Sequence, residues 1–302
     1  MSDKLSIIIP AYNEGKHIYA NMTRCMETFS KRELDYELII VDDGSTDNTR
    51  AEAEKIISPR IKVVGYSANK GKGHAILYGL RYADGELVTF LDADLDLDPR
   101  QIDVFMEYME KYKADVVIGS KRHPLTKIEF YPQSRRFFSA GYNILLKAIF
   151  GLALSDTQAG FKLFKKEVLE VVAPKLLVKR FAFDVEILAY AHSLGYKIVE
   201  APLVMNFHRG SWGRLKIDDI LRMGIDTMAI ACRFHIPQSC GKILRDSGMM
   251  LIIFLLLMAF YRYYNPYAFP GIENRTLYVL IGLGILIISL NVPWDKLSAR
   301  LK

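Results

Sequence analysis

Short apolar runs alternate with longer amphipathic segments over the first 120 residues, and this alternation constrains the fold most strongly. The segments predicted to be β-strands are Leu5–Ala11, Tyr36–Val41, Ile61–Tyr66, Glu86–Leu91 and Asp115–Gly119. The segments predicted to be helices are Gly15–Ser30, Thr46–Ile57, Ala75–Ala83 and Pro99–Tyr112. Strands and helices that alternate with short connections build a parallel sheet with right-handed crossovers. The sequence therefore predicts an α/β domain whose sheet is mostly parallel.

Polar clusters stand at the ends of three of these predicted strands. The clusters are Tyr12-Asn13-Glu14, Asp42-Asp43 and Asp92-Ala93-Asp94. Open α/β sheets bind their ligands outside the carboxyl ends of the strands. We therefore expect a ligand site at this edge of the sheet, where Pro10, Ala11 and Tyr12 supply a turn and an aromatic face.

Asp92 and Asp94 are one residue apart at a turn, so both carboxylates can reach one hard cation. Oxygen ligands suit Mg²⁺ or Mn²⁺, which keep several waters and bind substrate phosphates. Asp96 and Asp98 follow at once, and these carboxylates would repel one another without a cation. The alternative is a solvated acidic loop that caps the next helix, and Asp98 before Pro99 is a typical helix cap.

Asp42 and Asp43 form a second acidic pair, and a buried carboxylate at a strand end can accept a hydrogen bond from a nucleotide base. The alternative is capping of the following helix, with Ser45 or Asp42 as the N-cap. A glycine-bearing loop after the third predicted strand brings Lys70 and Lys72 to the same edge of the sheet. This edge therefore combines carboxylates with cations.

Several other kinds of site are excluded. Gly71 and Gly73 lack a third glycine three positions later, where Ile76 stands, so the dinucleotide-binding fingerprint fails. The sequence has no phosphate-binding P-loop, nucleophile elbow, HExxH or CxxC motif. The three cysteines have no metal-ligand spacing, and their odd number fits a reducing compartment. The net charge of +6 admits an anionic partner, but basic and aromatic residues do not interleave as in nucleic-acid-binding proteins.

Two apolar runs near the C-terminus, 248–264 and 276–294, have the length of transmembrane helices when their flanks are counted. The turn-forming segment 265–271 separates them, and Arg262 would extend to the membrane interface. Lysines and arginines flank the outer ends, which favours a hairpin with both ends in the cytoplasm. A pair of buried helices in a soluble domain is the alternative. We expect a globular domain over 1–236 and a membrane anchor over 237–302.

The pattern between residues 121 and 236 is less regular. Phe137–Leu154 is apolar with polar residues interspersed, so it is expected either to lie at a membrane surface or to be a packed helix. Phe183–Leu194 is predicted to be a helix and Lys197–Val204 a strand. Ile217–Phe234 has apolar residues at helical spacing and could lie on the bilayer surface before the hairpin.

Three stretches together resemble the inverting family 2 glycosyltransferases of the GT-A fold: Leu5–Glu14, Val41–Asp47 and Asp92–Asp94. Three further stretches resemble the dolichyl-phosphate β-glucosyltransferases, a sister group of the dolichyl-phosphate mannose synthases. They are Asn69–Gly73, Asp156–Phe164 and Arg180–Glu186. The resemblance spans about residues 5 to 230. Joined to the hairpin, it implies a Rossmann-like GT-A catalytic domain followed by two transmembrane helices.

The resemblance implies a role for each matching residue. The nucleotide-sugar site would comprise Pro10, Ala11, Tyr12, Glu14, Asp42, Asp43, Lys70, Lys72, Asp92 and Ala93. The catalytic group would comprise Asp94, Lys121, Arg122, Gln158 and Asp184, although the family usually has arginine where Lys121 stands. Mg²⁺ or Mn²⁺ would be held by Asp92, Asp94 and Asp96. The acceptor phosphate would be bound by Arg135, Arg136, Arg209 and Arg214.

The implied reaction is inverting transfer of a hexose from a nucleotide diphosphate sugar to a dolichyl or polyprenyl monophosphate. The β-linked product would form on the cytoplasmic face of the plasma membrane or the endoplasmic reticulum. UDP-glucose is the favoured donor, and UDP-N-acetylglucosamine and GDP-mannose stay open. A polysaccharide synthase is disfavoured because neither Trp212 nor Trp294 lies in a Gln-x-x-Arg-Trp motif, and a non-catalytic scaffold because the acidic pair is intact. The oligomeric state stays open, a homo-oligomer included.

Overall fold

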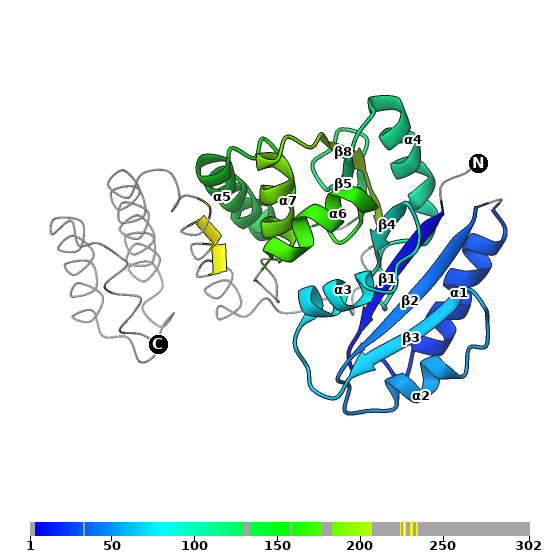
Figure 1. Ribbon diagram of the computed structural model, residues 1–302. Helices are drawn as coiled ribbons and strands as arrows, with labels where there is room; N and C mark the ends of the chain where they lie inside the picture. Colours follow the sequence, from blue (N-terminus) through cyan, green and yellow to red (C-terminus); the bar gives the residue numbers. More distant parts are fainter. Residues whose placement is uncertain are drawn as a thin grey trace, which may run out of the picture. The chain divides into compact units, whose positions relative to one another are not determined.

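The computed structural model describes residues 4–32, 34–129, 133–157, 159–176 and 183–206, together with 224, 226, 227, 230, 231 and 234. The chain divides into two compact units, Met1–Met223 and Gly224–Lys302. All the helices and strands with defined bounds belong to the first unit (Figure 1).

A seven-stranded sheet forms the centre of the first unit, in the order β3-β2-β1-β4-β7-β5-β8. Its strands are β1 (Leu5–Ala11), β2 (Tyr36–Asp43), β3 (Ile61–Tyr66), β4 (Leu87–Phe90), β5 (Val116–Ser120), β7 (Lys162–Lys165) and β8 (Ile198–Pro202). Strand β7 runs antiparallel to β4 and β5, and the other neighbouring pairs are parallel. Two further short strands, β6 (Lys127–Glu129) and β9 (Val204–Asn206), pair with each other. The predicted α/β fold with a mostly parallel sheet is confirmed.

Helices cover both faces of this sheet (Figure 1). They are α1 (Ile18–Ser30), α2 (Thr49–Glu54), α3 (Lys72–Leu80), α4 (Ile102–Tyr112), α5 (Gln133–Phe150), α6 (Lys166–Val172), α7 (Phe183–Ser193) and the 3₁₀ turns Pro99–Gln101 and Ala173–Lys175. Buried side chains of α1, α2 and α4 join one hydrophobic core, and those of α3, α6 and α7 join another. In β1, Ile7 and Ile9 enter the first core and Ile8 the second. Burial on both faces explains why these strands are continuous apolar runs.

Strand β7 lies in the middle of the sheet, where the sequence analysis predicted no strand. It reads Lys-Leu-Phe-Lys, and a run so short with lysine at each end lacks the apolar character of a central strand. Lys162 is nevertheless only 1% exposed. Lysine is almost never fully buried unless it is paired, and the pattern along the chain does not reveal a distant partner.

The helix after β2 begins later than predicted, at Thr49 instead of Thr46. Side chains hold the residues before it, because the Ser45 N–H donates to Asp42 Oδ1 at 3.1 Å. The Thr46 N–H donates to Asn13 Oδ1 at 2.9 Å. The interpretation of Ser45 as the N-cap was therefore wrong, and its hydroxyl instead accepts the Asn13 N–H at 3.0 Å.

One face of helix α5 is buried, and Asn143 Nδ2 on that face donates to the Ser155 carbonyl oxygen. Asn143, Leu146, Ile149 and Phe150 are buried, whereas Ile144 is exposed. The described part of this predicted apolar segment is thus an amphipathic helix, and its predicted place at a membrane surface stays a prediction. No helix within the described ranges combines the length and apolarity needed to cross a membrane. The predicted spans 248–264 and 276–294, and most of the predicted helix 217–234, lie outside the described residues.

A buried carboxylate organises the amino-terminal edge of the sheet. Glu37, at the start of β2, is 4% exposed. Its Oε1 accepts hydrogen bonds from the Ser6 hydroxyl at 2.6 Å and the Asp84 N–H at 2.7 Å. Its Oε2 lies 3.0 Å from Lys62 Nζ and 3.6 Å from Lys4 Nζ. Burial alone would raise the pKa of Glu37, but these donors and cations outweigh burial and lower the pKa.

Replacing Glu37 by Gln is expected to destabilise the full chain by about 1–3 kcal/mol near neutral pH, because buried donors lose their charged partner. A carboxyl group with a lowered folded pKa contributes stability above its unfolded pKa, and this is lost as the pH falls through the folded pKa. The gap between wild type and E37Q should therefore shrink on acidification. Urea unfolding in detergent at several pH values measures this difference in the free energy of unfolding between wild type and E37Q. E52Q, which removes a surface ion pair with Lys55, is the control, and equal losses in both variants would contradict the prediction.

Candidate active site

The loop after β4 presents carboxylates to solvent from a turn whose apolar residues are buried. Ala93 and Leu95 enter the core, whereas Asp94 and Asp96 are exposed. Leu95 has a φ of 53°, a left-handed conformation that is rare for a bulky residue and that clusters at functional sites. Its N–H donates to the Asp92 carbonyl oxygen at 3.1 Å. The Asp96 N–H donates to Asp94 Oδ1 at 3.1 Å, which orients the Asp94 carboxylate.

Asp98 is the helix cap that the sequence predicts. Its Oδ1 accepts the Arg100 N–H at 2.9 Å, and its Oδ2 accepts Arg100 Nε–H at 2.8 Å. The predicted cap is confirmed, so the Asp98 carboxylate serves the next helical turn and Arg100.

Lys72 is the first residue of α3 and forms an ion pair with Asp92. Gly71 before it has a φ of 95°, which favours glycine. Burial alone would lower the pKa of Lys72, but the charges of Asp92, Asp184 and Asp94 outweigh burial and raise it. The ammonium group therefore stays charged among these carboxylates, in the state that binds phosphate.

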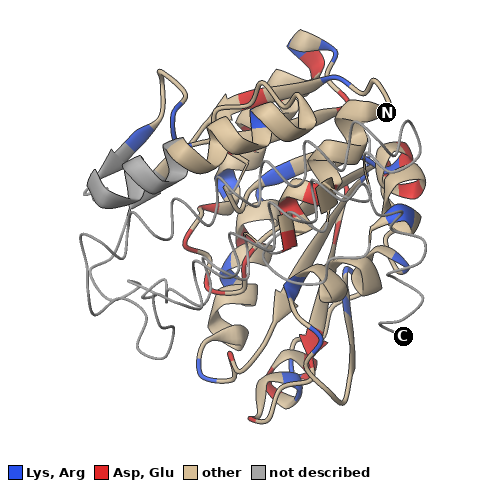
Figure 2. Cartoon of the chain, turned by 90° about the vertical axis from the view of Figure 1, so that its left-hand side faces the viewer, with Lys and Arg blue, Asp and Glu red and all other residues tan. Residues whose placement is uncertain are grey.

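Carboxylates crowd this edge of the sheet. Desolvation raises the pKa of Asp94, the hydrogen bond from Asp96 opposes this, and the charges of Asp92 and Asp96 raise the pKa further. Burial raises the pKa of Glu14, and the charge of Asp94 makes the next largest contribution. The predicted site residues Glu14, Asp92 and Asp94 are thus brought together. Elsewhere on the unit acidic and basic residues intermingle (Figure 2).

Asp43, at the end of β2, is buried and holds the loop before α3. Its carboxylate accepts hydrogen bonds from the Tyr66 hydroxyl at 2.7 Å and the Lys70 N–H at 2.8 Å. The Gly71 N–H and Asn69 Nδ2 add bonds at 3.0 and 3.1 Å. Asp43 therefore positions this loop, and its predicted bond to a nucleotide base stays a prediction.

The ends of β1 and β2 bring further predicted residues together. Ala11 pairs with Asp42 in the register of the two strands, and Pro10 pairs with the preceding residue of β2. Tyr12 follows directly and its side chain is 45% exposed. An accessible aromatic residue thus stands next to the acidic end of β2, and its predicted role in nucleotide binding stays a prediction.

The segment that leads into β7 meets the acidic loop at Gly160. A methyl group at this position would lie 2.8 Å from Asp92 Oδ2, which is closer than carbon and oxygen atoms pack. Only glycine lets the backbone approach the Asp92 carboxylate this closely.

Gly160→Ala is expected to displace the Asp92 carboxylate while leaving the fold intact. The new contact is with the end of a side chain, so the free energy of unfolding should change by less than about 1 kcal/mol. The affinity for Mn²⁺ in the presence of UDP should fall about tenfold, measured by titration calorimetry. Gly141→Ala is the control, because its added methyl group meets no atom within 4 Å beyond the backbone of its own helix and its chain neighbours. Equal Mn²⁺ affinity in both variants would contradict the predicted role of Asp92.

Lys121 follows β5 and is held by Asp156, which the sequence analysis did not single out. Asp156 is 2% exposed, and its Oδ2 accepts the Lys121 N–H at 3.1 Å and lies 3.6 Å from Lys121 Nζ. Glu200 of β8 fixes this turn by accepting the Ser155 hydroxyl at 2.6 Å and the Asp156 N–H at 3.1 Å. The one sequence signal for Asp156 was its place in the family-like stretch 156–164.

Asp184 lies in the first turn of α7 and pairs with Lys162 of β7. The distance from Lys162 Nζ to Asp184 Oδ1 is 2.7 Å. Helix α7 begins beside α3, since a methyl group on Gly73 would lie 2.8 Å from Phe183 Cβ. The predicted residue Asp184 is thus brought near Lys72, and Lys162 is a residue of this region that the sequence analysis missed.

The structure does not place every predicted residue. Gln158, Arg209 and Arg214 lie outside the described residues. Arg135 and Arg136 belong to α5, and their side chains are outside the description. The Arg122 N–H donates to Ser120 Oγ at 3.3 Å. The roles of these arginines and of Gln158 stay predictions.

The donor set at the acidic loop fits Mg²⁺ or Mn²⁺ in its chemistry. Such ions need only one or two protein carboxylates, because substrate phosphates and waters supply the other oxygens. Asp92 and Asp94 are the two carboxylates predicted for this role, and that role stays a prediction. The described part of the chain holds no group of three or more His, Cys, Asp or Glu side chains arranged for a metal. The predicted third ligand, Asp96, stays a prediction.

Comparison with known proteins places the chain in a family. Residues 6–172 match the model described as Glycosyl transferase family 2. Two dolichyl-phosphate beta-glucosyltransferases of Trichomonas vaginalis are similar to it, 32% identical over 249 residues and 34% identical over 254 residues. The first alignment covers 76% of this chain and 71% of the relative, and the second covers 76% and 73%.

Solved structures show the same fold. Glucosyl-3-phosphoglycerate synthase from Mycobacterium tuberculosis, in complex with Mn²⁺, UDP and phosphoglyceric acid, has a TM-score of 0.57 and 20% identity over 76% of this chain and 78% of that chain. The structure of its complex with Mg²⁺ and UDP has a TM-score of 0.57 and 20% identity, over 76% of this chain and 79% of that chain. The family match covers more than half of this chain and includes the acidic loop, Lys72 and β7. The chain therefore belongs to glycosyl transferase family 2 and is a glycosyltransferase.

Proposed function

We propose that this enzyme transfers glucose from UDP-glucose to a dolichyl or polyprenyl monophosphate, with inversion, giving a β-linked product. The observation that carries the proposal is the charge arrangement at the sheet edge. Lys72 pairs with Asp92 and lies within the electrostatic reach of Asp94 and Asp184. The ammonium group of Lys72 would bind the negative diphosphate there, and the carboxylate of Asp184 would accept hydrogen bonds from the sugar hydroxyls. The names of the Trichomonas relatives support the acceptor and the sugar, and the synthase complex with UDP-glucose supports the nucleotide.

Side chains of this chain would stabilise the diphosphate as it leaves the sugar. Asp92 and Asp94 would hold Mg²⁺ or Mn²⁺, and the ion would supply positive charge at the departing diphosphate. Lys72 binds the same diphosphate and offsets the charge that grows on it. Tyr12 and Asp43 would bind the uracil base, and Glu14 would line the same nucleotide pocket. Binding of this kind positions the anomeric carbon and stabilises charge.

The nucleophile is a phosphate oxygen of the lipid. It is already anionic at neutral pH, so the reaction requires no strong general base. Arg135, Arg136, Arg209 and Arg214 would bind this anion and hold it in line with the departing diphosphate. Lys121 and Arg122 would offset the charge that grows on that diphosphate. Asp184 accepts hydrogen bonds from sugar hydroxyls. Attack from the side opposite the diphosphate inverts the anomeric carbon, so an α-linked donor gives a β-linked product.

The acceptor cannot leave the bilayer, and this explains the proposed architecture. The hairpin 248–264 and 276–294 would keep the catalytic domain at the cytoplasmic membrane face. Support for this anchor comes from the length of the two apolar runs and their flanking cations.

The test is lipid-dependent release of nucleotide by the full chain in membranes. UDP-glucose, UDP-N-acetylglucosamine and GDP-mannose are supplied separately, each with and without dolichyl phosphate and Mn²⁺. We expect UDP release from UDP-glucose that requires both additions. Faster release from another donor would overturn the choice of glucose. Release that is independent of dolichyl phosphate and of a shorter polyprenyl phosphate would overturn the lipid acceptor.

A further inference from the structure

Strand β7 runs against its neighbours, and this direction separates its two lysines. Lys162 pairs with Phe90, the last residue of β4, and so lies at the carboxyl edge where the site is. Lys165 pairs with Leu87 at the opposite edge. Each lysine has an aspartate partner at nearly the same distance, 2.7 Å for Lys162 and 2.8 Å for Lys165. One strand therefore carries two ion pairs of similar length, only one of which is at the active site. They differ in burial, because the side chain of Lys162 is 1% exposed and that of Lys165 is 38% exposed.

The ion pair at the active site is buried on one side and open on the other. The side chain of Lys162 is 1% exposed and that of Asp184 is 19% exposed. Lys162 Nζ also donates to the Ala159 carbonyl oxygen at 2.6 Å. The ammonium group is thus held beneath Asp184, and the carboxylate keeps an accessible edge.

A lysine at this place is poorly explained by stability. Removing an ammonium group from water costs several kcal/mol, and apolar side chains of similar volume often stabilise a protein as well as a buried ion pair does. The next two residues of β7, Leu163 and Phe164, are fully buried apolar residues. A methionine would fill the position without the cost of a buried charge.

We propose that Lys162 is a positioning residue that orients the Asp184 carboxylate toward the sugar of the donor. Its bond to Ala159 ties the same cation to the segment in which a methyl group on Gly160 would lie 2.8 Å from Asp92 Oδ2. Lys162 therefore links the carboxylate that faces the sugar to the carboxylate at the diphosphate. This inference rests on the proposed function, which assigns Asp184 to the sugar. It adds that Lys162 of β7 holds the Asp184 carboxylate in place.

The test is a double-mutant cycle in the full chain with Lys162→Met, Asp184→Asn and the double variant. Lys162→Met should lower kcat/KM about 10–100-fold, through a higher KM for the donor as well as a lower kcat, because Asp184 loses its orientation. When Asp184→Asn is already present, adding Lys162→Met should lower kcat/KM by less than about threefold more. Lys162→Arg, which keeps the charge, should restore most of the activity and tests the proposal if Lys162→Met does not fold.

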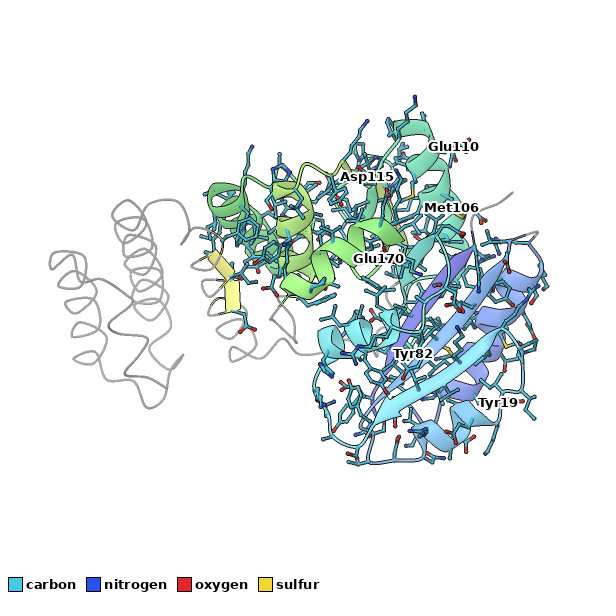
Figure 3. All side chains as sticks on the ribbon, viewed as in Figure 1. Tyr19, Tyr82, Met106, Glu110, Asp115 and Glu170 are labelled. Carbon is cyan, nitrogen blue, oxygen red and sulfur yellow. The ribbon has the colours of Figure 1, made fainter. Side chains whose placement is uncertain are left out.

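Lys165→Met is the matched control. It breaks the pair of Lys165 with Asp115, which precedes β5 and is labelled in Figure 3, at the edge of the sheet opposite the site. It should leave kcat/KM within about threefold of wild type. Thermal unfolding of both variants measures any loss of stability. Equal kinetic losses in Lys162→Met and Lys165→Met would overturn the proposal. A full additional loss in the Asp184→Asn background would also overturn it, since Lys162 would then act independently of Asp184.

A binding measurement separates this inference from the proposed function. Calorimetry gives the affinity for the nucleotide sugar that wild type binds and for the matching nucleoside diphosphate. Lys162→Met should weaken binding of the nucleotide sugar about tenfold and leave the diphosphate nearly unchanged. If wild type shows no lipid-dependent release, the proposed function fails, and the binding result still decides the role of Lys162. Equal changes for both ligands would contradict a role at the sugar.

Discussion

Asp94→Asn is expected to lower lipid-dependent sugar transfer roughly 1,000-fold, because one of two carboxylates that fit a divalent cation is lost. The amide keeps the size of the side chain and can still accept the Asp96 N–H, which now donates at 3.1 Å. The fold and membrane association should therefore be unchanged. The loss should appear in kcat at saturating UDP-glucose and persist at high Mn²⁺ concentration.

Asp98→Asn is the matched control, since it changes a carboxylate of the same loop that caps a helical turn. Asparagine is also a good cap, so activity should stay within about threefold of wild type. A non-catalytic protein would be indifferent to both substitutions. Full transfer activity in the Asp94→Asn variant would remove the acidic loop from the proposed mechanism.

Lys72→Met should lower kcat/KM about 100-fold, comparable to the loss of one preorganised donor at a developing charge. The ion pair with Asp92 shows where the ammonium group lies, and its raised pKa keeps it charged. Methionine retains most of the side-chain volume, so the free energy of unfolding should change little. Steady-state kinetics with UDP-glucose and dolichyl phosphate measure the effect.

Lys55→Met is the control for loss of a lysine, because Lys55 pairs with Glu52 on the surface of the unit. It should have less than about twofold effect on kcat/KM. If the two lysine variants behaved alike, Lys72 would be a surface charge without a role at the diphosphate. A loss in Lys72→Met confined to KM for the lipid would assign the cation to the acceptor instead.

The parallel part of the fold could be predicted because its signal is local. Strands buried on both faces are apolar runs, and each is followed by a helix with its own periodicity. Strand β7 could not be predicted in this way, because Lys162 is buried only by virtue of partners on α7 and in the preceding turn. A buried charged residue can be predicted from sequence only when its ion-pair partner is known.

The residues of the candidate site also fall into those that local sequence predicts and those that depend on distant contacts. Asp92, Asp94 and Lys72 could be expected at one edge, since the acidic loop and the glycine-bearing loop with Lys72 each come after a predicted strand. Helix α3 begins at Lys72, three residues earlier than the predicted start at Ala75. Their supports could not be expected, because they come from distant parts of the chain. Glu200 fixes the turn of Asp156 across 44 residues, and Asp156 holds Lys121 across 35. Such contacts are properties of the folded sheet.

The most direct test of the account is the structure of the lipid product. The full chain in membranes receives UDP-glucose, dolichyl phosphate and Mn²⁺, and the lipid is analysed by mass spectrometry and NMR. We expect dolichyl phosphate that carries a single hexose in β-linkage, absent after chelation of the metal and in Asp94→Asn. Release of UDP without a hexosyl lipid, or an α-linked product, would contradict inverting transfer to a lipid phosphate.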